Sequence, residues 1–193
     1  MPEYRRRLPH FHRDDAYLFL TWRLWGSLPQ APETRSYPTP GHAFIAADRV
    51  LHRDRSGPLW LNQPRIARLV AEAIVVGESE RGFYELCAWA IMPNHVHLLI
   101  LPKIAVAKIT RWLKGSTARR ANPLLERTGR PFWQDESYDH WLRNSKEHGR
   151  IISYIEENPA SAGLVDWPWS SGVWQAKPPG PPEPHPSFTE SEM

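Results

Sequence analysis

Cysteine and long apolar segments are scarce in this chain. Its 193 residues include a single cysteine, Cys87, which excludes an intramolecular disulfide and a zinc cluster of the Cys-x-x-Cys type. No apolar run approaches the length that spans a bilayer, and no apolar segment follows the N-terminal arginines. We therefore expect a cytoplasmic protein without a membrane partner.

The stretch between Lys103 and Arg130 is poor in acidic residues. This stretch holds eight lysines and arginines but one acidic residue, Glu126, although the formal net charge of the chain is only +3. Residues 1–13 form a second basic region, an arm without periodicity. Such blocks indicate a polyanion partner, and a solvated tail and a solvated helix face are the alternatives. The candidate phosphate contacts are Arg5, Arg6, Arg7, Lys108, Arg111, Lys114, Arg119 and Arg120.

The length and patterning of the chain predict one domain, at residues 1–171, followed by a disordered proline-rich tail at residues 172–193. Apolar and alternating patterns predict strands at residues 17–25, 83–91 and 95–101, and a last strand or an irregular extended segment at residues 131–143. Helical spacing predicts helices at residues 62–77, 104–121 and 144–158, and a short helix at residues 42–52. This order is that of a ferredoxin-like α+β domain, an antiparallel sheet with helices packed on it and an added C-terminal helix. The strands at residues 17–25 and 95–101 should lie in the middle of the sheet.

Two histidines stand two residues apart directly after the turn at Pro93-Asn94. Side chains alternate between the faces of a strand, so His95 and His97 should point the same way and converge on one point. An incidental pair of surface or core histidines is the alternative, and a partner elsewhere in the chain must decide between them.

The last predicted helix offers such a partner. Ile151, Tyr154, Ile155 and Asn158 share one face at helical spacing. If this face lies against the two histidines, both imidazoles and the Asn158 carbonyl oxygen can hold a divalent cation, with the Tyr154 hydroxyl beside it. Such an open site favours Mg²⁺ or Mn²⁺ over a structural zinc. Because Asn158 precedes a proline, the direction of its side chain stays open.

A tyrosine beside a metal that binds phosphate can act as a nucleophile. A tyrosyl phosphodiester conserves the energy of the broken bond for religation, which predicts reversible strand cleavage. An ordinary amphipathic tyrosine is the alternative for Tyr154, and Tyr138 is a rival nucleophile without a ligand-type residue at helical spacing.

Several stretches together resemble a known family. They are residues 6–10, 90–99, 112–115, 129–134, 154–159 and 162–165. The chain is similar to the single-tyrosine HUH transposases of the IS200-like group and, more narrowly, to REP-associated tyrosine transposases. The resemblance implies a DNA-nicking and strand-transfer enzyme that cleaves single-stranded DNA at a hairpin-flanked site and forms a 5′-phosphotyrosine. It also implies His95 and His97 as the metal pair, Tyr154 as the catalytic residue and, where relatives often carry glutamine, Asn158 as a further ligand.

Two other functions stay open from the sequence. A domesticated nucleic-acid-binding protein would keep the basic surface without turnover, and a metal-dependent phosphodiesterase would use water in place of Tyr154. The sequence is compatible with a monomer or a homodimer, and therefore with an active site built within one chain or across two.

Overall fold

A computed structural model describes residues 16–28, 40–53 and 57–174 of the chain. The predicted basic arm, with Arg5, Arg6 and Arg7, and most of the predicted proline-rich tail lie outside the described residues. A four-residue helix, α5 (Ser171–Trp174), spans the predicted boundary between domain and tail. None of the described helices combines the length and apolar character needed to cross a membrane.

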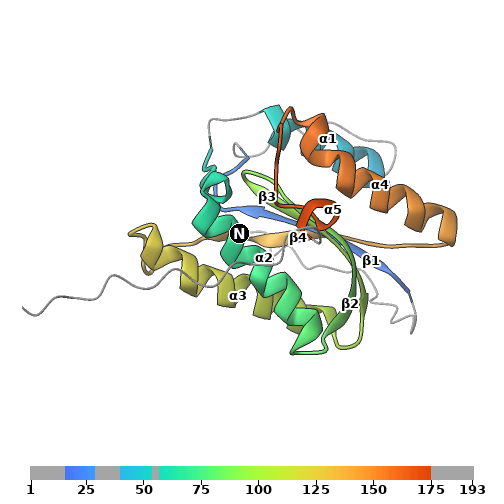
Figure 1. Cartoon of the computed structure of the whole chain (residues 1–193), viewed down its shortest axis with the longest axis horizontal. Coiled ribbons are helices and arrows are strands. Elements are labelled where there is room, and N and C mark those ends of the chain that lie inside the picture. Colours follow the sequence, from blue (N-terminus) through green and yellow to red (C-terminus); the bar gives the residue numbers. More distant parts are fainter. Residues whose placement is uncertain (1–15, 29–39, 54–56, 175–193) are drawn as a thin grey trace, which may run out of the picture.

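Four antiparallel strands form the sheet. They are β1 (Leu18–Leu24), β2 (Tyr84–Ile91), β3 (His95–Pro102) and β4 (Trp133–Trp141), in the spatial order β2-β3-β1-β4. This order and the flanking helices confirm the predicted ferredoxin-like α+β architecture. β1 and β3 are the two inner strands, as predicted from their apolar composition (Figure 1).

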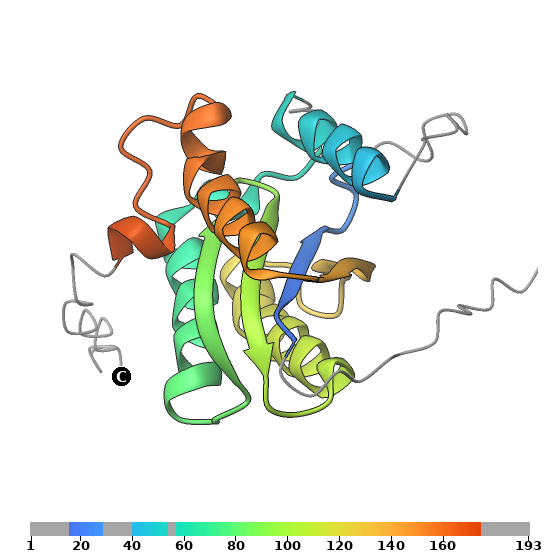
Figure 2. The ribbon, with the colours of Figure 1, turned by 90° about the vertical axis from the view of Figure 1, so that its right-hand side faces the viewer.

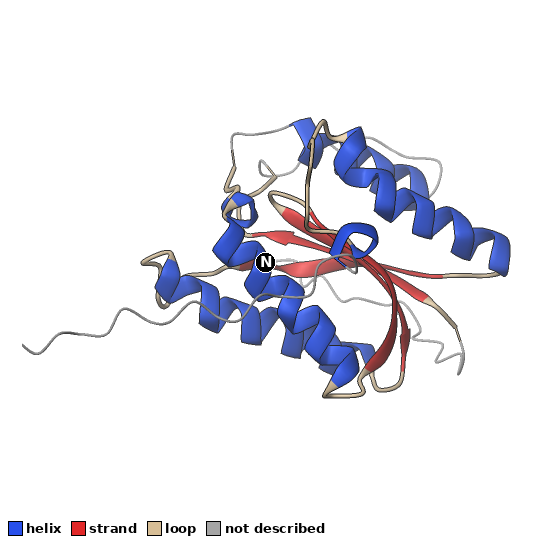
Figure 3. Cartoon of the chain, viewed as in Figure 1, coloured by secondary structure: helices blue, strands red, loops and turns tan. Residues whose placement is uncertain are grey.

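The helices form a layer on each face of the sheet. α2 (Pro64–Ser79) and α3 (Val106–Leu124) cover one face and pack against each other. α4 (Ser145–Ser161) packs on β2 and β3 from the opposite face, and α1 (Pro40–Arg53) lies beside α4 on that side (Figures 1–3). A single 3₁₀ turn, Trp60–Asn62, leads into α2.

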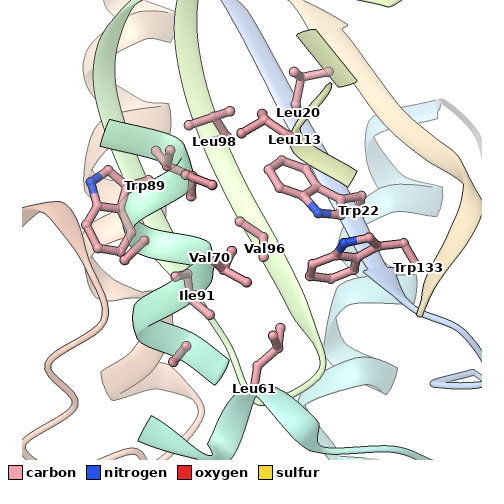
Figure 4. Packing of buried hydrophobic residues seen from close by; sticks show 14 of the residues in the cluster. Leu20, Trp22, Leu61, Val70, Trp89, Ile91, Val96, Leu98, Leu113 and Trp133 are labelled. Carbon is pink, nitrogen blue, oxygen red and sulfur yellow. The ribbon is translucent and has the colours of Figure 1, made fainter. Parts of the chain in front are cut away.

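Alternation along the inner strands separates two apolar cores. Leu20, Val96 and Leu98 point toward α2 and α3 and pack with Trp22 and Trp133 (Figure 4). The intervening side chains, among them Phe19 and Leu99, pack against α4 on the other face. Burying each leucine or phenylalanine contributes about 1.5–3 kcal/mol, so both faces fix the register of β3. That register places His95 and His97 on the α4 face.

Two helices continue past a proline at which the sequence predicts their ends. α3 includes Pro123 and α4 includes Pro159, each within the last turn. A proline there removes one amide donor, while the following amides still bond back: Leu125 N–H donates to Ala121 O and Ala162 N–H to Asn158 O. The predicted Asn144 cap is confirmed, since its side chain accepts from Glu147 N–H at 2.9 Å.

Two further details differ from the prediction. Gln63, and not Asn62, occupies the N-cap of α2, with Pro64 in the first turn. Trp169 lies in a stretch without recognisable patterning, yet it is buried, and its carbonyl accepts from Ile91 N–H at 2.8 Å. This segment therefore packs along the outer edge of β2.

Candidate active site

The two histidines meet on the α4 face of the sheet, as their spacing predicts. The Nε2 atoms of His95 and His97 lie 3.0 Å apart, and both side chains are fully buried. Two ring nitrogens at this separation would repel each other if both carried a proton. They are suited to point lone pairs at a shared cation.

Asp48 on α1 adds a carboxylate that the sequence reasoning missed. Its Oδ1 lies 3.3 Å from Nε2 of His95 and 3.3 Å from Nε2 of His97. The carboxylate is 3% exposed, and within the described part of the chain Oδ1 is a buried oxygen without a hydrogen-bond partner. A buried carboxylate oxygen facing two imidazole nitrogens fits a divalent cation.

His52 lies one helical turn beyond Asp48 and joins the same cluster. Its Nε2 is 3.5 Å from Asp48 Oδ2, and its ring stacks on that of His95 with centroids 5.6 Å apart. One ligand atom from each of Asp48, His52, His95 and His97 lies within 4.8 Å of the others. The spacing Asp-x-x-x-His in the predicted helix at residues 42–52 could have pointed to this pair, because it places both side chains on one helix face.

Asn94 fixes the ring of His95. Its Nδ2 donates to Leu51 O at 2.9 Å, which turns its Oδ1 toward Nδ1 of His95 at 2.6 Å. In the neutral ring Nδ1 therefore carries the proton, which leaves Nε2 available to bind a cation. Nδ1 of His97 is held at 2.8 Å from Thr21 Oγ1 on β1. Metal-binding histidines are commonly oriented through their second nitrogen in this way.

Burial sets the charge state of the cluster. It lowers the pKa of His95 to about 4, so this imidazole is neutral near pH 7, as a metal ligand must be. Burial acts to raise the pKa of Asp48, but the imidazoles of His95 and His97 outweigh it and hold that pKa below its usual range. His95 thus presents a neutral ring nitrogen beside the negative charge of Asp48.

α4 brings Tyr154 and Asn158 to the same place. The Tyr154 hydroxyl donates to Asp48 Oδ2, and its ring lies edge-on to His97 with centroids 5.7 Å apart. Asn158 Oδ1 lies 2.9 Å from His52 Nε2, and its Nδ2 lies 3.4 Å from Asp48 Oδ2. Burial, followed by the charge of Asp48, raises the pKa of Tyr154. The structure therefore brings together all four predicted residues, His95, His97, Tyr154 and Asn158, within one chain.

The rival Tyr138 has a different setting. It lies on β4 beside Phe19, with ring centroids 6.2 Å apart, and burial raises its pKa. It borders a groove of about 270 Å³ that also reaches Asp48 and Thr21. Tyr154, in contrast, bonds directly to Asp48.

The basic helix α3 covers the face of the sheet opposite α4 (Figure 1), whereas His97 contacts Tyr154 on the α4 face. Lys108, Arg111, Arg119 and Arg120 are exposed there, and Arg120 pairs with Glu72 at 3.0 Å. Lys114 donates to the carbonyls of residues 134–136 and to Ser137 Oγ at 3.0–3.3 Å, which ties α3 to β4. DNA contact by these residues stays a prediction, and for Lys114 it would require exchange of these bonds.

Comparisons with known proteins agree with this geometry. Residues 64–158 match the family model described as "Transposase IS200 like", a range that contains His95, His97, Tyr154 and Asn158 but not Asp48 or His52. The chain is 29% identical over 124 residues, 62% of its length, to the REP-associated tyrosine transposase of Escherichia coli (strain K12), and this covers 70% of that protein. It is 31% identical over 103 residues, 46% of its length, to the "Putative REP-associated tyrosine transposase" of Haemophilus influenzae, covering 58% of that protein.

A solved structure shares the fold. It is described as a REP-associated tyrosine transposase bound to a REP hairpin, and it aligns with a TM-score of 0.55 and 24% identity over 88% of this chain and 82% of its own. In this chain the shared fold carries a histidine pair on an inner strand and a tyrosine on a helix packed against that strand. The chain is thus similar to the IS200-like transposases over residues 64–158, and the curated proteins that it resembles include REP-associated tyrosine transposases.

Proposed function

We propose that this protein cleaves and rejoins single-stranded DNA at hairpin-flanked sites, with Tyr154 as the nucleophile. One observation carries the proposal: the Tyr154 hydroxyl bonds to a carboxylate whose other oxygen faces the His95–His97 pair. The nucleophile is thereby held beside a cluster suited to a cation that can bind a phosphate. The relatives named as transposases support this choice of reaction.

The residues that would hold a divalent cation, Mg²⁺ or Mn²⁺, are His95, His97 and Asp48. Asn158 is proposed as a further ligand, but its Oδ1 faces His52 at 2.9 Å, so ligation would exchange that contact for a metal bond. A bound cation would withdraw charge from the scissile phosphate and offset the negative charge of Asp48. Oxygen atoms of the DNA phosphate would complete an oxygen-rich set of ligands.

Tyr154 performs the bond exchange. Its Oη attacks the scissile phosphorus, an Oη–P bond forms, and the bond from phosphorus to the 3′-oxygen breaks. The hydroxyl proton of Tyr154 leaves along its hydrogen bond to Asp48 Oδ2 and passes on to water, and the departing 3′-oxygen takes a proton from water. Attack by a 3′-hydroxyl on the 5′-phosphotyrosine reverses these steps and joins two strands.

Hairpin DNA is the proposed partner. One structural relative is described as bound to a REP hairpin, and the exposed cations of α3 offer phosphate contacts on this chain. The proposed active-site residues come from a single chain, which supports catalysis by a monomer, while a homodimer stays compatible with the sequence.

Incubation with Mn²⁺ and hairpin oligonucleotides from the DNA that flanks the gene tests the proposal. We expect a covalent protein–DNA adduct that Tyr154→Phe abolishes, while DNA binding is retained. Tyr138→Phe is the matched control and should form the adduct at the wild-type rate. An adduct that persists in Tyr154→Phe would overturn the assignment. Binding without any adduct would instead favour the nucleic-acid-binding protein, and multiple turnover without an adduct would favour the hydrolase.

A further inference from the structure

A cavity of about 100 Å³ lies beside His95. It lies between the end of α1, the 3₁₀ turn, the β2–β3 turn and the end of α4. His52 and His95 form part of its wall, and His52 also lines the larger groove that contains Tyr154. His52 and His95 therefore lie between this cavity and Asp48, and His52 borders both the cavity and the groove of the candidate active site.

The chemistry of the wall is mostly apolar. Leu51, Leu59, Met92 and Leu164 supply hydrocarbon surface. Asn94 has both ends of its amide engaged, with Leu51 O and with His95 Nδ1. Asn62 is exposed at the rim, where its amide offers one donor and one acceptor group.

The size and shape of this cavity limit its occupant. A cavity of about 150 Å³ lined by apolar side chains holds a whole benzene ring, so one of about 100 Å³ can take only part of a planar ring and leaves the rest of the ring outside. A nucleobase is such a ring, and it carries hydrogen-bonding groups on its edge. A paired base inside a duplex cannot enter a pocket of this kind, whereas an unpaired base can.

We propose that this cavity is a pocket for the unpaired base of a nucleotide next to the scissile phosphate, with Asn62 contacting the edge of that base. The proposal rests on the proposed function, because it requires the phosphate to lie at the His95–His97 pair. The occupied pocket would position the strand and would restrict cleavage to single-stranded DNA. Nucleobase binding in this pocket also provides a means of selecting the sequence at the cleavage site.

Filling the pocket tests the proposal. Substrates with an abasic site at each nucleotide near the cleavage position are compared in wild type, Leu59→Trp and Val165→Trp, by the rate of adduct formation. Val165 is 84% exposed beside Leu164, so Val165→Trp adds the same indole outside the pocket. Stacking of one base contributes about 1–3 kcal/mol, so the wild-type rate should fall at least about fivefold when the base is absent at one position.

We expect Leu59→Trp to cleave the intact substrate slowly, by a similar factor, and to show no further loss when that one base is absent. Val165→Trp should behave as wild type. An equal abasic penalty in wild type and Leu59→Trp, or an unchanged rate in Leu59→Trp, would overturn the pocket. Thermal unfolding verifies that Leu59→Trp is folded, and Leu164→Trp provides a second filled pocket.

A binding measurement separates this proposal from the proposed function. 2-Aminopurine is placed at successive positions of the hairpin strand, and its fluorescence is measured on binding to wild type and to Leu59→Trp. A change at one position that occurs in wild type and is absent in Leu59→Trp supports the pocket even if no adduct forms. The absence of any such position argues against the pocket even if Tyr154 proves to be the nucleophile.

Discussion

Replacing Asp48 with asparagine tests whether α1 supplies a metal ligand. The asparagine side chain keeps the shape of the aspartate and an oxygen toward Tyr154, but it removes the negative charge that lies 3.3 Å from both histidine nitrogens. Loss of a supporting group at a metal site typically weakens metal affinity about 10–100-fold, and loss of a direct charged ligand should reach the upper end of that range.

The effect can be measured as a shift in thermal stability. At a Mn²⁺ concentration of about 100 times the wild-type Kd, metal binding stabilises wild type by about 2.7 kcal/mol. For a chain of this length that corresponds to a rise in Tm of about 5–11 °C. A variant with about 100-fold weaker affinity would gain only about 0.4 kcal/mol at the same concentration, a rise of about 1–2 °C.

The assay is thermal unfolding with and without Mn²⁺, supported by direct Mn²⁺ titration. Asp139→Asn is the matched control, because Asp139 is an exposed aspartate on β4 and its replacement should leave the Mn²⁺ shift unchanged. If Asp48→Asn retained the full wild-type shift, Asp48 would not be a ligand, and the three-residue metal set would have to be abandoned.

Two further predictions concern the scaffold. Gly77→Ala should destabilise the protein by about 1–3 kcal/mol in denaturant unfolding, because the added Cβ would lie 2.1 Å from the Oη of buried Tyr84. This clash should outweigh the helix propensity of alanine, which exceeds that of glycine by about 1 kcal/mol. Stabilisation would show that Tyr84 can move. Burial raises the pKa of the Cys87 thiol from its ordinary 9.0 to about 11, so the thiolate fraction at pH 8 is about 100-fold smaller than that of an ordinary thiol. Alkylation by iodoacetamide should therefore be slow at pH 8, should rise about tenfold per pH unit up to pH 10, and should become fast in urea. Rapid labelling of the folded protein at pH 8 would contradict this prediction.

The sequence predicted those parts of the site that depend on local periodicity. Alternation along β3 placed His95 and His97 on one face, and helical spacing placed Tyr154 and Asn158 on one face of α4. The order of elements then identified the sheet on which the two faces meet. Each of these inferences needed only the geometry of one element and the short connections between neighbours.

Asp48 could not be predicted in the same way. It precedes the first predicted residue of α2 by more than a dozen positions and follows a proline-rich loop, so no short connection fixes where α1 packs. Its burial depends on tertiary contacts, including the bond from Asn94 to Leu51 O that anchors the end of α1. The buried Trp169 was missed for a similar reason, because its position depends on pairing with the edge of β2.

The contribution of α1 changes how the site must assemble. Residues 64–158 carry both histidines and the tyrosine, but the acceptor of the Tyr154 hydroxyl comes from outside that range. The buried Asp48 of α1 carries a charge that a cation would neutralise. Metal binding and the docking of α1 should therefore favour each other, because each supplies what the other lacks: α1 brings the carboxylate, and the cation offsets the cost of burying it. Because the Tyr154 hydroxyl bonds to Asp48, docking of α1 should also help to orient the proposed nucleophile, which would link that orientation to metal binding.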